Sequence, residues 1–333
     1  MKEPILLGID GGNTKTDFFL FTISGVCLGH LRTGSCSHEA LLGGFVDAEK
    51  VLKEGIEKVC EKAEILPKDI SSSVLGLAGV DTRAQHEKLT DIAKHLLTGK
   101  ILVCNDSMLG IMAAAPNGVG VCCINGTATS ISGMDESGQR LQVGGIGHYS
   151  SDFAGGEFAA REVLRKVYSA RYRGGESTML TQGVLELFEV SEEANLMELF
   201  HPDCLVWDKK LELGLDRLLF HCARNKDAVA VSIVDDMART LAESTAGCIK
   251  GLKFDEMVTI VLAGSLWVKC DYPLMQKKYC QEVAERVDQS CKFILLEEPP
   301  ALGAILEAYR RLEQTQIPSE FYSKVACAMN NLQ

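Results

Sequence analysis

The sequence has no apolar segment long enough to cross a membrane and no cluster of basic residues. Its hydrophobic runs fall well short of the roughly 20 apolar residues that a membrane-spanning helix needs. The first apolar run is also shorter than the core of a signal peptide, so we expect a cytoplasmic protein. The formal net charge of −11 argues against nucleic acid or an anionic membrane as partner, since both attract clustered Lys and Arg. These absences favour a small-molecule partner.

Three common motifs of metal, redox and nucleotide sites are also missing. None of the 13 cysteines has the Cys-x-x-Cys spacing of zinc or redox centres. Cys104, Cys122 and Cys123 lie in apolar, strand-like segments, where reduced thiols behave as small hydrophobic side chains. No G-x-x-x-x-G-K-[ST] motif occurs, and no G-x-G-x-x-G motif follows a strand. The sequence therefore argues against a P-loop and against a dinucleotide-binding fingerprint.

The chain of 333 residues carries the same order of elements twice. Its length favours two domains with a cleft between them as the default site. In each half, three strands in a meander precede alternating strands and helices. Such an alternation indicates parallel strands joined by helical crossovers, and the loops at the carboxyl ends of these strands usually bind ligands. A helical insertion over 155–250 follows the second meander. The expected meander strands are 4–9, 17–23 and 26–32 in the first half and 118–124, 128–134 and 139–145 in the second.

A turn of small polar residues separates the first two strands of each half. These turns are hairpin loop 1, DGGNTKT (10–16), and hairpin loop 2, NGTAT (125–129). Glycines let backbone N–H groups approach phosphate oxygens, and threonine hydroxyls add donors. Each turn alone is equally typical of a ligand-free hairpin, but the repetition at equivalent places favours phosphate binding. The candidate nucleotide contacts are Gly11, Gly12, Asn13, Thr14, Lys15, Gly126, Thr127, Ala128 and Thr129.

Two carboxylates lie at the ends of predicted strands. Asp10 ends the first strand, where its carboxylate can hold Mg²⁺ directly or through water. Asp106 ends the strand KILVCND, and its carboxylate can accept the proton of an attacking hydroxyl. The alternative for Asp106 is an N-cap of the helix predicted over 107–115, and the two roles are compatible. If the two strands are parallel neighbours, both carboxylates face one cleft.

These motifs resemble those of the BadF/BadG/BcrA/BcrD ATPase family, which includes N-acetylglucosamine kinases and belongs to the superfamily of acetate kinases, sugar kinases and actin. The resemblance extends nearly end to end. It implies an α/β fold of two ribonuclease-H-like domains that close around ATP and Mg²⁺, often in a homodimer, and transfer of phosphate to an amino sugar. The segments that carry it are DGGNTKTD, GLAGVD (76–81), NDSMLGIMAAAPNGVG (105–120), NGTAT, VGGIGHYSSD (143–152), LAGSLW (262–267) and PPALGAIL (299–306).

The resemblance also implies domain bounds and residue roles. The N-terminal domain would comprise 1–116 with a returning C-terminal helix, 317–333, and the other domain 117–316. By motif, Thr14 and Thr127 match phosphate-contacting threonines, and Asp106 matches the catalytic base. Gly264 and Ser265 lie in the turn that matches the adenosine-binding motif. The candidate sugar contacts are Ser37, His38, Gly79, Asp81, Gly145, Ile146, Gly147 and Asp152.

The residues that match sugar contacts depart from the family pattern more than the residues that match phosphate contacts. Ser37 stands where amino-sugar kinases carry asparagine, and Ile146 replaces a tryptophan, so N-acetylglucosamine itself is not fixed by the motifs. Ala128 adds a methyl group where a glycine is typical of the second phosphate loop. Two alternatives therefore stay open: an ATPase activator of a dehydratase or reductase, and a non-catalytic sugar sensor. The activator needs an iron–sulfur cluster, yet no cysteine occurs from Ile124 to Asp203.

Overall fold

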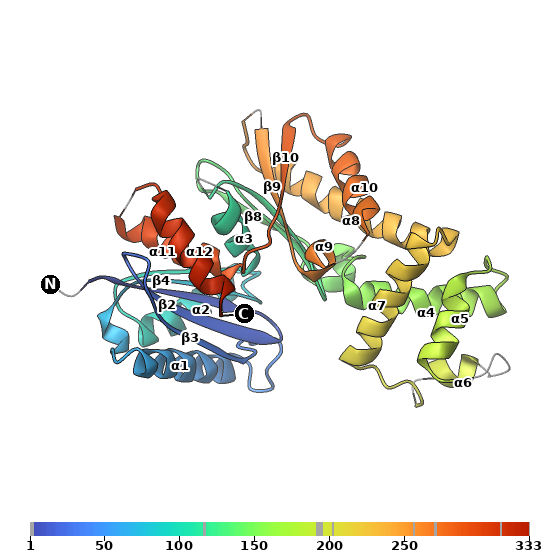
Figure 1. Cartoon of the computed structure of the whole chain (residues 1–333), viewed down its shortest axis with the longest axis horizontal. Helices are drawn as coiled ribbons and strands as arrows, with labels where there is room; N and C mark the ends of the chain where they lie inside the picture. The colour runs from blue at the N-terminus through green and yellow to red at the C-terminus, as the bar shows by residue number, and fades with distance from the viewer. Residues whose placement is uncertain are drawn as a thin grey trace.

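Two five-stranded mixed sheets form the framework of the molecule (Figure 1). A computed structural model describes residues 3–115, 118–190, 196–201, 203–255, 257–269, 272–313 and 315–332. The first sheet contains β1 Ile5–Gly11, β2 Lys15–Thr22, β3 Cys27–Gly34, β4 Ile70–Leu77 and β5 Lys100–Cys104. The second contains β6 Gly120–Asn125, β7 Thr129–Met134, β8 Arg140–Val143, β9 Met257–Ala263 and β10 Ser290–Leu295.

The two sheets share one topology. The strand order is β3-β2-β1-β4-β5 in the first sheet and β8-β7-β6-β9-β10 in the second, when the latter is read from β8. In each, the first three strands are antiparallel and the last two run parallel to the central strand. The predicted duplication is therefore confirmed. It places hairpin loop 1, between β1 and β2, and hairpin loop 2, between β6 and β7, at equivalent positions.

Helices cover the first sheet on both faces. Helices α1 and α2 pack on one face, where Phe18 fills the space left by Gly55 of α1. The C-terminal helix α12 packs on the other face, with Phe321 and Val325 in one cluster with Phe21. The assignment of this C-terminal helix to the first domain stays a prediction. The helices are α1 Phe45–Lys62, α2 Arg83–Leu96 and α12 Ser319–Asn330, together with the short 3₁₀ helix Pro67–Asp69.

Two helices cross between the sheets. Helix α3, Ser107–Ala114, packs mainly on β6, β7 and β9 of the second sheet, whereas α11, Ala301–Glu313, packs on β1 and β4 of the first. They cross each other at Gly303, where an added Cβ would lie 2.0 Å from the carbonyl oxygen of Leu109. The division of the chain at residues 116 and 317 stays a prediction. Each of these helices therefore packs on the sheet of the other half of the chain.

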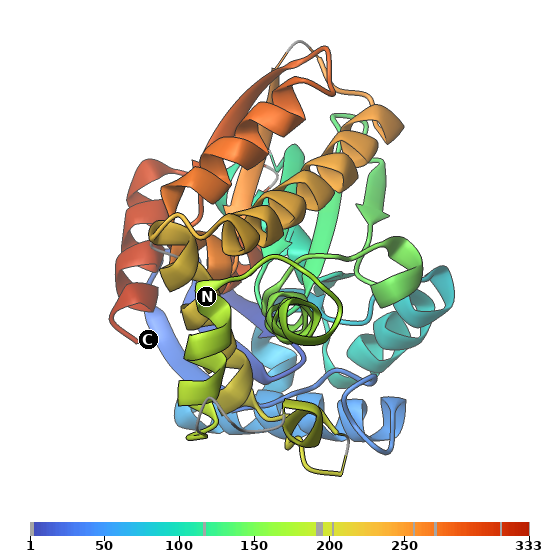
Figure 2. The same ribbon diagram turned by 90° about the vertical axis from the view of Figure 1, so that its right-hand side faces the viewer.

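A helical body follows β8 and extends away from both sheets (Figures 1 and 2). Helix α8 continues from it onto the second sheet, so one apolar cluster joins the insertion to the β6–β9 core. Within the described part of the chain, none of the helices combines the length and hydrophobicity required to span a bilayer. The remaining helices are α4 Gly156–Tyr172, α5 Met179–Leu187, α6 Leu196–Phe200, α7 Lys209–Arg224, α8 Ala228–Gly251, α9 Ser265–Val268 and α10 Pro273–Ala284, with a 3₁₀ turn at Gly147–Ser150.

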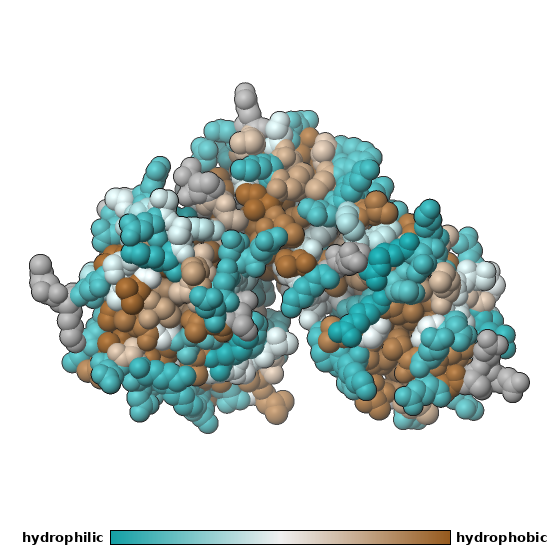
Figure 3. All heavy atoms as spheres, viewed as in Figure 1, coloured by the Kyte–Doolittle hydropathy of each residue, from teal (hydrophilic) through white to brown (hydrophobic). Residues whose placement is uncertain are grey.

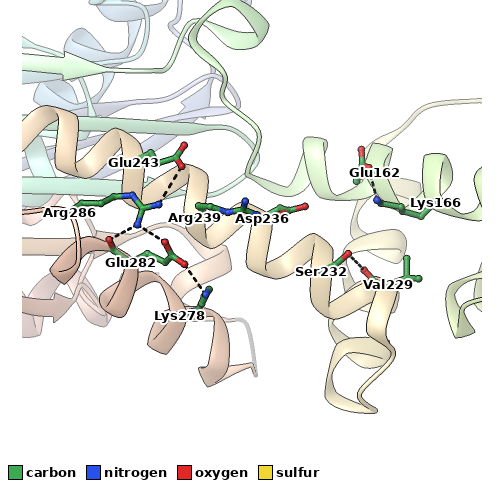
Figure 4. Close-up of polar contacts among 10 residues, drawn as sticks. All are labelled: Glu162, Lys166, Val229, Ser232, Asp236, Arg239, Glu243, Lys278, Glu282 and Arg286. Atoms are coloured by element: carbon green, nitrogen blue, oxygen red, sulfur yellow. Dashed lines mark hydrogen bonds and ion pairs between the residues drawn. The ribbon is translucent and has the colours of Figure 1, made fainter. Parts of the chain in front are cut away.

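A charge network joins α10 to α8 on the outer face of the second domain (Figure 4). The Glu282 carboxylate pairs with Lys278 at 2.8 Å and with Arg286 at 2.5 Å, and Arg286 also reaches Glu243 of α8 at 3.5 Å. The ammonium of Lys278 and the guanidinium of Arg286 hold the pKa of Glu282 below its usual value. Glu282 therefore stabilises the fold in its ionised form.

We expect Glu282→Gln to lower the free energy of unfolding by about 1 kcal/mol at pH 7. Because the folded-state pKa is lowered, this contribution is present above the ordinary Glu pKa of 4.5 and disappears as the pH falls through the folded value. Urea unfolding of both proteins at pH 7 and pH 3.5 measures the difference. Glu243→Gln, which removes only the longer contact of an exposed carboxylate, is the control and should have the smaller effect. Equal stability of Glu282→Gln and the parent at pH 7 would contradict the assignment.

Candidate active site

The carboxyl ends of β1, β4 and β5 meet at one edge of the first sheet. The register pairs Asp10 with Gly76, and Gly76 with Cys104, so the three parallel strands end side by side. Asp10 lies at the end of β1, Asp106 follows β5, and the segment 78–81 follows β4. The side chains that the sequence places after separate strands are thus brought to the same edge, as their parallel arrangement predicts.

The carboxylate of Asp106 is close enough to that of Asp10 to disfavour its ionisation. Burial raises the pKa of Asp10 to about 7, and the negative charges of Asp106 and Asp17 add to this shift. Burial also raises the pKa of Asp106 to about 6; Asp81 adds to this shift and the Ser107 amide offsets part of it. Both residues keep some solvent exposure, and the Asp10 carboxylate forms no hydrogen bond to a described residue. A cation or a transferable proton would stabilise this pair.

Asp106 occupies the N-cap position of α3 without a side-chain capping hydrogen bond. The neighbouring Asn105 caps the helix instead. Its Oδ1 atom accepts hydrogen bonds from the Ser107 amide at 3.0 Å and from the Ser107 hydroxyl. The Ser107 hydroxyl also contacts Ser132 of β7, which ties the start of α3 to the second sheet. The start of α3 therefore positions the Asp106 carboxylate, which forms no capping hydrogen bond and stays available for another partner.

Hairpin loop 1 presents its tip to solvent. Asn13 and Thr14 are exposed, and the Gly12 amide donates to the Lys15 carbonyl at 2.9 Å. A Cβ at Gly11 would lie 2.5 Å from Cys36 Sγ and 2.8 Å from Leu77 Cδ2, so a larger residue there would force both side chains to shift. Lys15 pairs with the buried Asp17 at 3.3 Å, so its ammonium is already engaged in this structure. Loop 1 therefore offers backbone groups, one amide and one threonine hydroxyl as free contacts.

Hairpin loop 2 is supported from behind by the start of α4. The amides of Gly156 and Glu157 donate to the carbonyls of Gly126 at 2.8 Å and Thr127 at 3.1 Å. Gly264, with φ of +105°, allows the β9–α9 turn to approach, because a Cβ there would lie 2.6 Å from the Asn125 carbonyl oxygen. The two carbonyls are thereby satisfied, while the exposed Thr127 and Ala128 remain at the loop surface.

A pocket of about 370 Å³ lies beside hairpin loop 2. It brings together Gly126, Thr127 and Ser265, which the sequence assigned to phosphate and adenosine contacts. The α7 side of this pocket could not be predicted, because the helical insertion carries no recognised motif. The only sequence signal there is Asp208, which caps α7 by accepting from the Leu211 amide at 2.8 Å. The additional charged lining residues are Lys209, Glu212, Asp216, Arg217, Arg224 and Lys269.

The candidate sugar contacts of the first domain lie together. The His38 ring stacks on Phe45 with a centroid separation of 4.0 Å, and an added Cβ at Gly79 would lie 2.7 Å from that ring. The Ser37 hydroxyl and the Nδ1 atom of His38 are both buried without a hydrogen-bond partner among the described residues. These two polar atoms are therefore unsatisfied in the described structure.

Asp81 connects the two domains in this structure. Its Oδ1 atom accepts from Asn105 at 2.9 Å and from Gln142 of β8 at 2.6 Å. The sequence analysis placed Asp81 among sugar contacts without anticipating Gln142. The observed contacts show that one oxygen of Asp81 is engaged across the domain boundary, directly next to Asn105 and Asp106.

The loop from Gly145 to Asp152 is organised around a carboxylate. The Oδ2 atom of Asp152 accepts from the amides of Gly145 at 2.9 Å and Gly147 at 2.7 Å and from the Ser150 hydroxyl at 2.6 Å. Ile146 is 64% exposed. With Thr127 and Ala128, parts of this loop line a second pocket of about 180 Å³. Figure 3 shows a hollow between the body that holds β1–β3 and the helices α4–α7.

Cys204 and Cys222 follow the cysteine-free stretch, and Trp267 lies in α9. Cys222 is buried in the core on α7, whereas Cys204 is exposed outside any helix, so they do not form a paired surface site for a cluster. Trp267 is 6% exposed and packs beside Tyr279 with ring centroids 5.0 Å apart. It is therefore a core residue.

Known proteins share this sequence pattern and fold. The chain is 28% identical over 277 residues to an N-acetyl-D-glucosamine kinase of Dictyostelium discoideum, covering 79% of this chain and 86% of that protein. It is 23% identical over 308 residues to an N-acetylmuramic acid/N-acetylglucosamine kinase of Clostridium acetobutylicum, covering 91% and 97%. A candidate N-acetylglucosamine kinase from Chromobacterium violaceum superposes with a TM-score of 0.66 at 18% identity, covering 91% and 98%.

The structural similarity confirms the expected α/β fold of two ribonuclease-H-like domains. A family model matches residues 7 to 308, a range that includes both hairpin loops, Asp106 and the β9–α9 turn. The chain therefore belongs to the BadF/BadG/BcrA/BcrD ATPase family.

Proposed function

We propose that this protein is an ATP-dependent sugar kinase that transfers the γ-phosphoryl group to a hydroxyl of N-acetylglucosamine or a related amino sugar. The observation that carries the proposal is the position of Asp106, a partly exposed carboxylate beside Asp10 at the strand edge between two equivalent hairpin loops. The names of the two curated relatives support the reaction class and the amino sugar. N-acetylmuramic acid is the alternative acceptor.

Asp106 acts as the general base in this proposal. With its pKa at about 6, it is mainly ionised at neutral pH yet basic enough to accept a proton from a hydroxyl. The hydroxyl oxygen forms a bond to the γ-phosphorus while the bond from that phosphorus to the β–γ bridging oxygen breaks, and ADP leaves. The hydroxyl proton passes to Asp106. Backbone N–H groups and the hydroxyls of Thr14 and Thr127 stabilise the charge on the phosphate oxygens.

Asp10 fits a magnesium site. Its carboxylate has a raised pKa and no hydrogen-bond partner among the described residues, so a divalent cation would relieve its repulsion with Asp106. The described residues contain no group of three or more His, Cys, Asp or Glu side chains suited to a metal. A single carboxylate supplemented by phosphate oxygens and water is the donor set that Mg²⁺ commonly uses. Bound there, Mg²⁺ would neutralise charge on the ATP phosphates.

The acceptor is assigned to the surfaces on both sides of Asp106. Ser37, His38, Gly79 and Asp81 form the first-domain side, and the loop from Gly145 to Asp152 forms the other. The exposed Ile146 offers an apolar contact without the flat face of an indole. Since Asp152 already accepts three hydrogen bonds within its loop, we propose that its second oxygen is the one available for sugar hydroxyls. Closure of the domains would exclude water from the reaction.

The pH dependence of the rate follows from Asp106. The base must be ionised, so kcat/KM should be constant above the pKa of about 6 and fall about tenfold per pH unit below it. The raised pKa of Asp10, about 7 before a cation binds, should make the apparent magnesium affinity weaken as the pH falls through 7. Initial rates from pH 5 to 8.5 at saturating Mg²⁺ separate the two effects. A rate that does not change between pH 5 and 7 would refute the base assignment.

The sugar is identified by a coupled ADP-release assay. Purified protein with Mg²⁺-ATP is supplied with glucose, glucosamine, N-acetylglucosamine, N-acetylmannosamine or N-acetylmuramic acid, and the phosphorylated carbon is located by NMR of the product. We expect the highest kcat/KM with an N-acetylated amino sugar. Sugar binding without ADP release for the whole panel would instead favour the non-catalytic sensor.

Assembly and location remain predictions of the family resemblance and composition. We propose a homodimer, as is common in this family, and a cytoplasmic protein. Analytical ultracentrifugation at micromolar concentration tests the first: sedimentation as a species of about 36 kDa, the mass of one chain, would contradict a dimer.

A further inference from the structure

Lys209 contacts hairpin loop 2 from the helical insertion. It is the first residue of α7, and its ammonium donates to the Thr127 hydroxyl at 2.8 Å and to Glu212 Oε1 at 2.5 Å. The Lys209 side chain is 50% exposed, whereas that of Glu212 is 7% exposed. A half-exposed cation is therefore held against the loop by a buried carboxylate.

A second buried carboxylate lies beneath this contact. Asp216 is 7% exposed, and its Oδ1 atom has no hydrogen-bond partner among the described residues. Burial raises the pKa of Asp216 to about 7, the charge of Glu212 adds to the shift and that of Lys209 opposes it. Gly156 allows the approach of Asp216, since a Cβ there would lie 2.6 Å from Asp216 Oδ2. Glu212 thus holds the Lys209 ammonium beside the loop through a direct hydrogen bond, and the charge of Asp216 attracts the same ammonium.

The pocket around Lys209 suits a polyphosphate better than a neutral sugar. Arg217, Arg224 and Lys269 line the same space, together with Gly126 and Ser265. Cations concentrated beside a glycine-bearing loop attract anions in a protein whose net charge is −11. The acceptor residues lie instead around Asp106 and the Gly145–Asp152 loop.

We propose that Lys209 is a nucleotide-binding residue that contacts the terminal phosphates of ATP and ADP, an inference that rests on the proposed kinase function. In the ligand-free protein the Thr127 hydroxyl accepts from the Lys209 ammonium. When phosphates occupy hairpin loop 2, the Thr127 hydroxyl turns its proton to a phosphate oxygen, and the Lys209 ammonium moves to the same phosphate. Glu212 keeps one hydrogen bond to Lys209 and orients it. Nucleotide binding then joins the helical insertion to the loop.

The test compares nucleotides with different numbers of phosphates. Isothermal titration calorimetry with Mg²⁺ measures the Kd of ATP, ADP and AMP for the parent, Lys209→Met, Lys209→Arg and Lys210→Met. A charge-assisted hydrogen bond to phosphate corresponds to a loss of about 10- to 100-fold in affinity. We expect that loss for ATP and ADP in Lys209→Met, unchanged AMP binding, and substantial recovery in Lys209→Arg. Lys210, exposed and without a described contact, is the matched control and should bind all three normally.

Each of the other outcomes would overturn either this inference or the proposed function. If Lys209→Met binds ATP, ADP and AMP as tightly as the parent, Lys209 does not contact phosphate, and the proposed kinase function is unaffected. An equal loss for all three nucleotides would show that Lys209 supports the fold of the pocket, which also overturns the inference. Failure of the parent protein to bind any adenine nucleotide would refute the proposed function itself.

Discussion

Asp106→Asn is expected to lower kcat for sugar phosphorylation by about 10³-fold while changing the Kd of ATP little. Asparagine keeps the size and polarity of the side chain but cannot accept the hydroxyl proton. The Asn105 hydrogen bonds that organise the start of α3 do not involve the replaced carboxylate, so the local backbone should persist. Steady-state kinetics and ATP titration on the same preparation measure the two quantities.

The same substitution should make the folded protein more stable at neutral pH. The folded pKa of Asp106, about 6, lies above the ordinary value of 3.8, so ionisation in the folded state carries an energetic cost. That cost is absent below pH 3.8, grows as the pH rises to 6, and is complete above it. Since the side chain keeps some solvent exposure, we expect a gain of about 1 to 2 kcal/mol at pH 8. Urea unfolding measures it.

The control is Asp91→Asn, at an exposed position of α2 without a described contact. It should change neither the rate nor the stability. A substantial kinase activity in Asp106→Asn would remove Asp106 from the role of base. Loss of both activity and stability would show instead that its carboxylate holds the structure together.

Gly303→Ala is expected to destabilise the fold by about 3 kcal/mol. The new Cβ would lie 2.0 Å from the Leu109 carbonyl oxygen and 2.8 Å from the Ala113 amide nitrogen. Both are backbone atoms of α3, so no side chain can rotate away, and the two helices must separate. Because Asp106 precedes α3, the separation should also lower kcat. Thermal and urea unfolding give the stability, and the ADP-release assay gives the rate.

Gly247→Ala is the matched control for this helix crossing. Gly247 lies in α8 and is exposed, and a Cβ added there would have no heavy atom within 4 Å beyond its own helix backbone. There the substitution should stabilise the protein by about 0.5 to 1 kcal/mol, since alanine favours a helix over glycine. If Gly303→Ala were as stable as Gly247→Ala, the close backbone approach of α3 and α11 at Gly303 would be contradicted.

Local sequence patterns were sufficient to predict the duplicated framework. The meanders, the hairpin turns and the strand ends at Asp10 and Asp106 depend on alternation and turn residues within a few positions of each other. Equivalent strand order in the two sheets then follows from repeating the same pattern. For this reason the positions of both hairpin loops could be predicted without tertiary information.

Contacts between distant segments could not be predicted in the same way. The close crossing of α3 and α11 depends on Gly303. In the sequence, Gly303 cannot be distinguished from other glycines within helices. Lys209 lies 82 positions from Thr127, and Gln142 lies 61 positions from Asp81. Neither pair forms a sequence motif. Each contact requires only that the two side chains meet in the folded protein, and this places no constraint on the neighbouring residues. These contacts are visible only once the helical insertion and β8 are placed.

The most direct test of the account is a crystal structure with a non-hydrolysable ATP analogue, Mg²⁺ and N-acetylglucosamine. We predict that the phosphates contact the backbone of both hairpin loops, 10–16 and 125–129, and that an Asp106 carboxylate oxygen lies about 3 Å from a sugar hydroxyl. Phosphates bound away from these loops, or an Asp106 side chain directed away from the sugar, would contradict the proposed mechanism.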